Sequence, residues 1–261
     1  MTITLEKNCT IFLQRHSHRG KTQIVPCTVS ILKPEHAEQS VALHDRVAQG
    51  LSGDIFIRSD ISEIKRCLSD DGFTLGVWHE DKLVCARTVK TDAQWVNEAL
   101  EAIGEPSDPT HSTAVTDYMV VDREFRGNSI QFLTFFLSET LISINKDRIV
   151  STVAPKNIFS LQNIMRCGFY ITGLKQLYGG FWRYVTEKKL RGSLPIWTNW
   201  HHTVSIRNTD EQRRLIAEGN VGYKLVKRIG IGGFAVLYAP ICVEMPVEGQ
   251  PHRCKPVIRM L

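Results

Sequence analysis

The alternation of apolar and polar positions predicts a mixed series of strands and helices along most of the chain. Short runs rich in β-branched and aromatic residues, bounded by Gly, Pro or charged residues, predict strands. These runs are 27–33, 72–89 (a hairpin turning at His79-Glu80-Asp81), 112–121, 147–155, 170–177 and 181–188. Apolar residues at helical spacing predict helices at 35–51, 60–70, 91–104, 129–146 and 157–169. The expected fold class is α/β, with helices on the faces of a mixed sheet.

Residues at the ends of these runs strengthen the assignment. Pro34 precedes the first helix, and Asp60 stands at an N-cap position with Glu63 three residues later. Asn157 is expected to cap the helix that ends at Gly168. The run 129–146 is apolar over much of its circumference, which predicts a deeply packed helix.

The last part of the chain repeats a similar order on a smaller scale. A strand at 200–208, a helix at 209–219 and strands at 222–230 and 234–241 form a strand-helix-strand-strand unit. Residues 166–185 and 217–238 also share weak local similarity, which fits either an internal structural repeat or a chance likeness of two hairpins. We expect three regions: an N-terminal extension at 1–25, a main domain at 26–190 and a C-terminal unit at 191–261.

The extension contains the basic stretch Arg15–Lys21. We expect a solvated tail there, with an arm that contacts phosphate as the alternative. The C-terminal unit is expected to complete an acceptor pocket or to form an interface in a homodimer.

Composition narrows the class of protein. Hydrophobic residues make up 43% of the 261 residues and charged residues 23%, which is ordinary for a globular protein. A net charge of +5 suits an anionic ligand such as a nucleotide but falls short of a dedicated nucleic-acid binder. The seven cysteines include no CxxC pair, which argues against a disulfide framework and against a metal site. No membrane segment or signal peptide is recognisable, so we expect a cytoplasmic protein.

The stretch VVDREFRGNSIQFLTFFL, residues 120–137, joins a predicted strand to a predicted helix. Gly127 allows the backbone to approach an anion closely or to take a positive φ, and Arg126 adds positive charge. Successive backbone N–H groups and the start of a helix are a favourable arrangement for phosphate. Taken alone, the pattern also fits an ordinary turn.

This stretch and its surroundings resemble the GNAT superfamily of acyl-coenzyme A N-acyltransferases. Residues 121–131 occupy the place of the family segment Val-x-Pro-x-Tyr/Phe-Arg-Gly-x-Gly-x-Gly/Ala. Asn157-Ile158-Phe159-Ser160 and Gly168-Phe169 match the family's later Asn-x-x-Ala/Ser and Gly-Phe. The resemblance covers roughly residues 26–190 and implies a GNAT-like fold with acetyl-CoA, or another acyl-CoA, as co-substrate. It implies an amine of a small molecule or an amino-acid-like acceptor as the second substrate.

The resemblance also implies which residues hold the donor. A bulge near the end of the strand would open a slot for the pantetheine arm, which backbone amides would hold. The expected donor-binding residues are Met119, Val121, Arg126, Gly127, Asn128, Ser129, Ile130, Gln131, Asn157 and Ser160.

Two positions depart from the family pattern. Ser129 and Gln131 stand where the family has glycine or another small residue. Three interpretations remain open. The site is a remodelled CoA site, or it takes a donor without this pyrophosphate (a carrier protein's phosphopantetheine arm or an aminoacyl-tRNA), or the chain is a catalytically silent CoA-binding module. A nucleic-acid partner, tRNA, is expected only under the second interpretation.

The catalytic groups are less well defined by the pattern. Many members of the family have a tyrosine that protonates the leaving thiolate, but Ile164 takes its place here. Tyr178 is the nearest substitute by sequence, and a packed, amphipathic tyrosine is the alternative. Asp117 lies in an apolar strand and is the candidate general base, with an edge position or a salt bridge as the alternative. Asp122 is expected to act as a cap.

Overall fold

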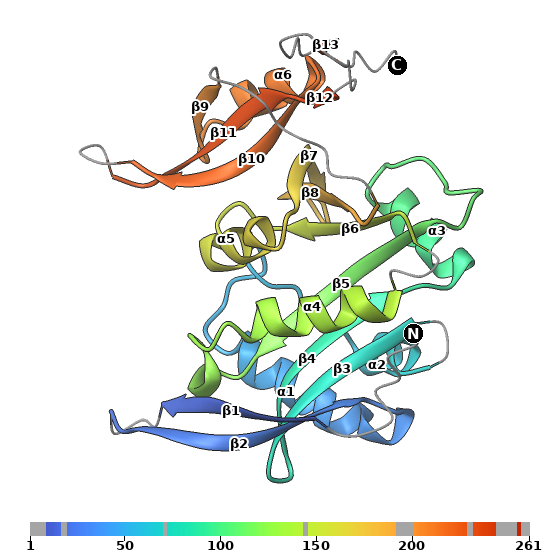
Figure 1. Ribbon diagram of the computed structural model, residues 1–261, viewed down its shortest axis with the longest axis vertical. Helices are drawn as coiled ribbons and strands as arrows, with labels where there is room; N and C mark the ends of the chain where they lie inside the picture. The colour runs from blue at the N-terminus through green and yellow to red at the C-terminus, as the bar shows by residue number, and fades with distance from the viewer. Residues whose placement is uncertain are drawn as a thin grey trace, which may run out of the picture. The chain divides into compact units, whose positions relative to one another are not determined.

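The computed structural model describes residues 9–16, 20–69, 72–142, 146–191, 201–228, 232–243 and 255–256. The chain forms two compact units, Met1–Ile149 and Val150–Leu261 (Figure 1). The boundary predicted near residue 190 lies within the second unit and stays a prediction. No helix in these residues is both long and apolar enough to cross a membrane.

The first unit is an antiparallel sheet with helices on both faces. Its strands are β1 (Cys9–His16), β2 (Thr22–Ile31), β3 (Gly72–His79), β4 (Lys82–Lys90) and β5 (Thr113–Val121), and they pair in that order. Its helices are η1 (Pro34–His36), α1 (Ala37–Ala48), α2 (Ile61–Cys67), α3 (Ala93–Ala102), η2 (Arg123–Phe125) and α4 (Ile130–Ile142). The predicted hairpin at 72–89 and the predicted helices are confirmed.

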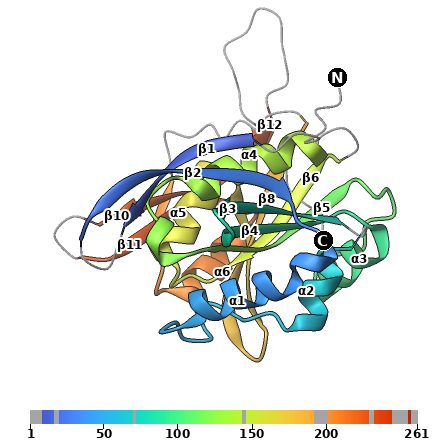
Figure 2. The same ribbon diagram turned by 90° about the horizontal axis from the view of Figure 1, so that it is seen from below.

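Two apolar layers lie on opposite sides of this sheet. Figure 2 shows α1 and α2 on one side of β3–β5 and α4 on the other. Leu43 and Ile64 from α1 and α2 are in the first layer, with Tyr118 from β5. Phe125 and Ile130 lie in the second layer, together with residues of β1 and β2. The segment that joins β5 to α4 therefore packs on the same layer as the N-terminal hairpin.

The N-terminal extension differs from its prediction. Residues 9–16, part of the expected N-terminal extension, form β1 and pair with β2 from Cys9–Val29 to His16–Thr22. Leu13 is 5% exposed and belongs to the second apolar layer. Arg15, which the sequence groups with a basic surface stretch, lies within β1 and pairs with Gln23 of β2.

β5 contains a one-residue bulge at Asp117 and Tyr118, which together face Thr88 of β4. The flanking pairs are Val89–Thr116 and Arg87–Met119. In a regular strand, consecutive side chains point to opposite faces of the sheet. A bulge can turn two of them toward the same face. Tyr118 packs edge-on against His44 of α1, with ring centroids 4.4 Å apart, and Asp117 Oδ2 lies 3.9 Å from Sγ of Cys67 in α2. Both side chains thus face the α1–α2 layer.

The second unit is built from two similar halves. The first contains α5 (Ile158–Arg166), β7 (Tyr170–Leu177) and β8 (Phe181–Lys189), preceded by β6 (Arg148–Val153), which begins just before the unit boundary. The second contains β9 (His202–Ser205), α6 (Thr209–Ala217), β10 (Asn220–Lys227) and β11 (Phe234–Pro240). Two short strands, β12 (Cys242–Val243) and β13 (Lys255–Pro256), follow.

Strand order and helix ends show that these halves are a structural repeat. The first half has the strand order β6-β8-β7 and the second β9-β11-β10, and β7 joins β10 antiparallel. Asn157 and Asn208 cap 9-residue helices in the same way, each accepting from the third backbone N–H of its helix. Gly168 and Gly219 follow these helices with φ of 90° and 85°. The repeat interpretation of the sequence similarity is therefore confirmed.

A buried glutamine on α6 links the two halves. Gln212 is fully buried, and its Oε1 accepts hydrogen bonds from Tyr184 of β8 at 2.7 Å and from Tyr238 of β11 at 2.8 Å. Its Nε2 donates to the carbonyl oxygen of Ser205 at 3.1 Å. Burial raises the pKa of both tyrosines, so their hydroxyls stay protonated and remain donors.

Gln212→Leu should destabilise the second unit more than Tyr184→Phe does. The leucine leaves two buried hydroxyls and one carbonyl without their partner, at about 2–4 kcal/mol in total, whereas Tyr184→Phe removes one donor for about 1 kcal/mol. Urea unfolding of both variants measures the difference. Equal loss of stability in the two variants would contradict the shared role of Gln212.

Candidate active site

The loop between β5 and α4 has the backbone form of an anion site. Gly127 has φ 87° and Ser129 has φ 56°, so two left-handed residues alternate with Asn128 just before α4 begins. Arg126, Gly127 and Ser129 are exposed. Ser129 therefore keeps a conformation that glycine adopts freely and other residues rarely adopt.

Free backbone donors accompany this geometry. Within the described residues, the N–H groups of Gly127, Asn128 and Ser129 donate to no protein acceptor. Such successive N–H groups at the start of a helix can bind an anion such as a phosphate. A side chain at residue 129 does not prevent this arrangement, because Ser129 is exposed and its backbone keeps the required φ.

Asp122 fixes the start of this loop. It is 5% exposed, and its Oδ2 lies 2.9 Å from Nζ of Lys82 and 3.1 Å from Nε of Arg46. Its Oδ1 accepts from the backbone N–H of Glu124 at 3.1 Å, so the predicted cap is confirmed. Burial alone would raise the pKa of Asp122, but the hydrogen bonds from Lys82, the Glu124 N–H and Arg46 outweigh it and lower the pKa.

A buried arginine fixes the other end of the loop. Arg87 of β4 is 4% exposed and donates to Thr134 Oγ1 at 3.0 Å, to Thr116 Oγ1 at 3.3 Å and to the carbonyl oxygen of Gln131 at 2.9 Å. The first turn of α4 is thus held to β4 and β5. Gln131, predicted to bind the donor, serves this anchoring through its backbone. Arg87 was not singled out from the sequence. The signal that could have revealed this contact is an arginine within an apolar strand run.

The side chain of Asn128 is engaged in hydrogen bonds within the protein and is not directed at the acyl donor. Its Nδ2 donates to the carbonyl oxygens of Gln14 at 2.6 Å and Phe125 at 3.0 Å, and its Oδ1 accepts from the Gln14 N–H at 2.7 Å. The backbone N–H of Asn128 has no acceptor among the described residues, and its predicted contact with the acyl donor stays a prediction. Arg126 is exposed, and its Nε makes only a long contact of 3.4 Å with the carbonyl oxygen of Val121.

The backbone N–H groups near the end of β5 point alternately to the two edges of the strand. The Asp122 N–H donates to the carbonyl oxygen of Val84 in β4 at 2.8 Å. Because N–H groups alternate between the two edges of a strand, those of Met119 and Val121 point away from β4. That Met119 and Val121 hold the pantetheine arm stays a prediction. The expected bulge lies directly before them, at Asp117 and Tyr118.

The candidate base Asp117 is part of a charged cluster on the α2 side of the sheet. Its Oδ1 lies 3.2 Å from Nζ of Lys90, which also lies over the ring of Trp95 at 4.5 Å. Of the roles considered for Asp117, the salt bridge is therefore the one that the structure shows. Burial, and then the charge of Asp117, raise the pKa of Glu63 in α2. The sequence marked Glu63 only as a capping residue.

Buried polar groups lie on the same layer. Among the described residues, Ser40 Oγ, both ring nitrogens of His44 and the Tyr118 hydroxyl are buried without a hydrogen-bond partner. Burial lowers the pKa of His44 to about 4, so this ring is neutral at physiological pH. No group of three or more His, Cys, Asp or Glu residues in the described part of the chain is placed to hold a metal ion.

The remaining predicted residues belong to the second unit. Asn157 caps α5 by accepting the Ser160 N–H at 3.1 Å, as predicted. Tyr178 is 49% exposed in the β7–β8 turn, and its hydroxyl lies 3.3 Å from Oγ1 of Thr152. Ile164, in place of the family tyrosine, is 6% exposed and packed in the core. Tyr178 is thus an accessible hydroxyl and not a packed side chain.

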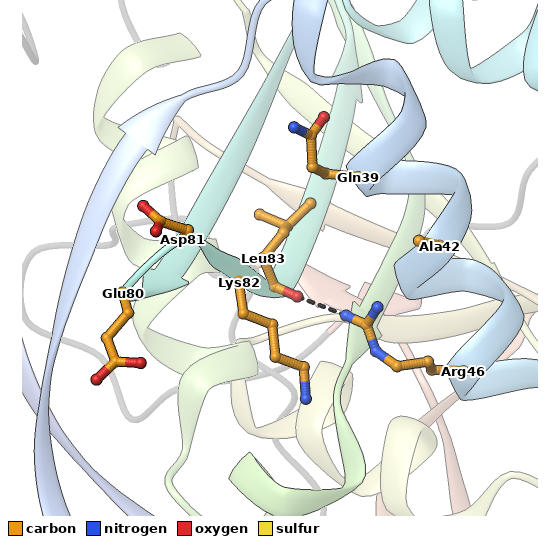
Figure 3. A pocket seen from close by; sticks show the side chains of 7 residues that line it. All are labelled: Gln39, Ala42, Arg46, Glu80, Asp81, Lys82 and Leu83. Carbon is orange, nitrogen blue, oxygen red and sulfur yellow. Dashed lines mark hydrogen bonds between the residues drawn. The ribbon is translucent and has the colours of Figure 1, made fainter.

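An open hollow lies beside the anchor of the loop. It has a volume of about 380 Å³. Its lining residues are Gln39, Ala42, Arg46, Glu80, Asp81, Lys82 and Leu83. In Figure 3, Arg46 from α1 and Lys82 from β4 reach toward the same end of this hollow, and Arg46 donates to the carbonyl oxygen of Leu83 at 2.7 Å. Both cations are occupied by Asp122, so the hollow is not a free anion site.

Comparison with known proteins identifies the fold. No protein-family model matches the sequence. No curated protein matches it either. Among solved structures, an acetyltransferase of the GNAT family from Streptococcus pneumoniae is 15% identical, with a TM-score of 0.49 over 62% of this chain and 99% of that one. Smu.2055 from Streptococcus mutans is 13% identical, with a TM-score of 0.50 over the same shares.

The GphF GNAT-like decarboxylase, in complex with isobutyryl-CoA, is 15% identical, with a TM-score of 0.49 over 62% of this chain and 99% of its own. The elements of the structure confirm the mixed α/β class, and the likeness to solved structures agrees with the predicted GNAT-like fold. At these identities the likeness concerns the fold and says nothing about activity.

Replacing Ser129 tests the backbone of the loop. A β-branched residue is disfavoured at positive φ, so Ser129→Val should be less stable than Ser129→Gly by about 1–2 kcal/mol. Thermal unfolding of the two variants measures this difference. Equal stabilities would mean that residue 129 does not take the left-handed conformation.

Replacing Asp122 tests the anchor and its dependence on pH. Asp122→Asn keeps the acceptor for Glu124 but loses the charge, at about 1–2 kcal/mol, because both cations are partly exposed. The folded pKa of Asp122 lies below its ordinary value of 3.8. The stabilisation should therefore be complete above about pH 4 and vanish as the pH falls through the folded pKa. Urea unfolding at pH 7 and pH 3 compares the two proteins; an equal difference at both values would refute the charge effect.

Proposed function

We propose that this protein is an acyltransferase that moves an acetyl or other short acyl group from acyl-CoA to an amine. The supporting observation is the loop after β5, where Gly127 and Ser129 both have positive φ and three successive N–H groups have no acceptor among the described residues. The sequence raised the question of whether Ser129 abolishes the pyrophosphate site. The left-handed conformation of Ser129 favours a remodelled CoA site.

The donor's phosphates would bind the N–H groups of residues 127–129 with help from Arg126, and its pantetheine arm would bind the N–H groups of Met119 and Val121. The reaction then needs a neutral amine held close to the thioester and a proton source for the leaving thiolate. We assign the first task to Asp117, whose carboxylate can accept the amine proton after exchanging its contact with Lys90. We assign the second task to Tyr178, whose side chain is exposed and carries a hydroxyl.

We propose a small-molecule or amino-acid-like amine as the acceptor. The side chain of Asp117 lies near the carboxylate of Glu63, and a cationic amine suits this pair of acids. A cytoplasmic location fits a CoA-dependent reaction and stays a prediction.

Calorimetry with acetyl-CoA and CoA tests the donor. The protein should bind both, and Arg126→Ala should weaken CoA binding by about tenfold, because a charge-assisted phosphate contact contributes about 1.5 kcal/mol. Arg123→Ala, an exposed arginine three residues earlier, is the matched control and should bind CoA like the wild type. Absence of binding at millimolar CoA would exclude this function.

Transfer is tested separately with a panel of primary amines. Formation of the acylated amine with release of CoA is the expected result, and Asp117→Asn should lower kcat/KM by about a hundredfold or more. Binding of CoA without acylation of any amine would leave a silent CoA-binding module in place of an enzyme.

A further inference from the structure

The N-terminal hairpin is fastened to the loop after β5. Asn128 forms two hydrogen bonds with the backbone of Gln14, one in each direction, at 2.6 and 2.7 Å. The Arg15 guanidinium pairs with the Glu124 carboxylate of η2 at 2.9 Å. Figure 1 shows β1 running beside the short segment that leads into α4. An asparagine amide that bonds both the N–H and the C=O of one residue extends the pairing of β1 like a further strand residue.

This fastening places a histidine at the open side of the loop. A Cβ added to Gly127 would lie 3.9 Å from Nε2 of His16 and within 4 Å of no other atom in the described structure. Nδ1 of His16 lies 3.1 Å from Oγ1 of Thr22, its partner across the hairpin. When Thr22 donates to Nδ1, Nε2 carries the proton and can donate it toward an anion. Within the described residues, Nε2 makes no hydrogen bond.

We propose that the β1–β2 hairpin is part of the donor site and that His16 binds the phosphates of the donor. The Nε2 of His16 lies beside the exposed Gly127, whose backbone N–H has no acceptor among the described residues. The hairpin supplies one wall of the phosphate site, and Asn128 is the positioning residue that holds this wall in place. This inference rests on the proposed acyl-CoA function.

The arrangement gives Asn128 a specific reason to be present. Its amide has both a donor and an acceptor, which the C=O and N–H of Gln14 require. Aspartate has no donor and would repel the Gln14 carbonyl oxygen. Asn128→Asp should therefore release the hairpin end while keeping the size and backbone of the residue.

The test compares CoA with pantetheine, which lacks the phosphates, in calorimetry with the full chain. His16→Ala should weaken CoA binding by about tenfold, the effect of one hydrogen bond to a charged group, and leave pantetheine binding unchanged. His16 is exposed, so the variant should fold normally. Thr10→Ala, at the exposed far end of β1, is the matched control and should bind both ligands like the wild type.

A double variant tests the positioning role. If Asn128 acts by holding His16 in place, then His16→Ala combined with Asn128→Asp should bind CoA no more weakly than Asn128→Asp alone. Additive losses would overturn the positioning role. Unchanged CoA affinity in His16→Ala, or equal weakening of pantetheine, would overturn the role of His16. Failure of the wild type to bind CoA would instead overturn the proposed function and this inference with it.

Discussion

The ion-paired carboxylate of Asp122 is the interaction on which the rest of the first unit depends. It joins α1 through Arg46, β4 through Lys82 and η2 through the N–H of Glu124. A buried carboxylate is unfavourable without such partners, so the strand end, the helix and the loop must assemble together. Because η2 follows directly, the position of the loop that leads into α4 depends on contacts with α1 and β4.

In the second unit, the structural repeat covers the edge of a sheet. A sheet edge left unpaired is open to association with another chain. Here the edge of β7 is taken by β10 from the second half of the repeat. Gly222 makes this close pairing possible, since a Cβ there would lie 2.8 Å from Val236 Cγ1 and 3.1 Å from Ile171 Cβ. The C-terminal half therefore does within the chain what strand pairing between subunits does elsewhere.

Caps and hairpins, which depend on neighbouring residues, were predictable from the sequence. Features that depend on contacts between distant residues were not. Caps at Asp122 and Asn157 and the hairpin at 72–89 follow from neighbouring residues, and all were predictable. The strand β1 was not predictable, because its apolar run is short and the residues that it packs against include those of η2 and α4. The contact of Asn128 with Gln14 joins residues 114 positions apart, which no periodicity can indicate.

Ser129 shows that a glycine motif is defined by backbone conformation and not by residue type alone. The family pattern has glycine at this position, and the letter alone suggests a lost site. A glycine motif matters through the φ values that it permits and the N–H groups that it exposes. Ser129 has φ 56° within a loop fixed at one end by Asp122 and at the other by Arg87, so tertiary contacts impose what glycine would allow. Strain of about 1 kcal/mol is then the cost of the serine, and the loop keeps the left-handed conformation that a glycine would allow.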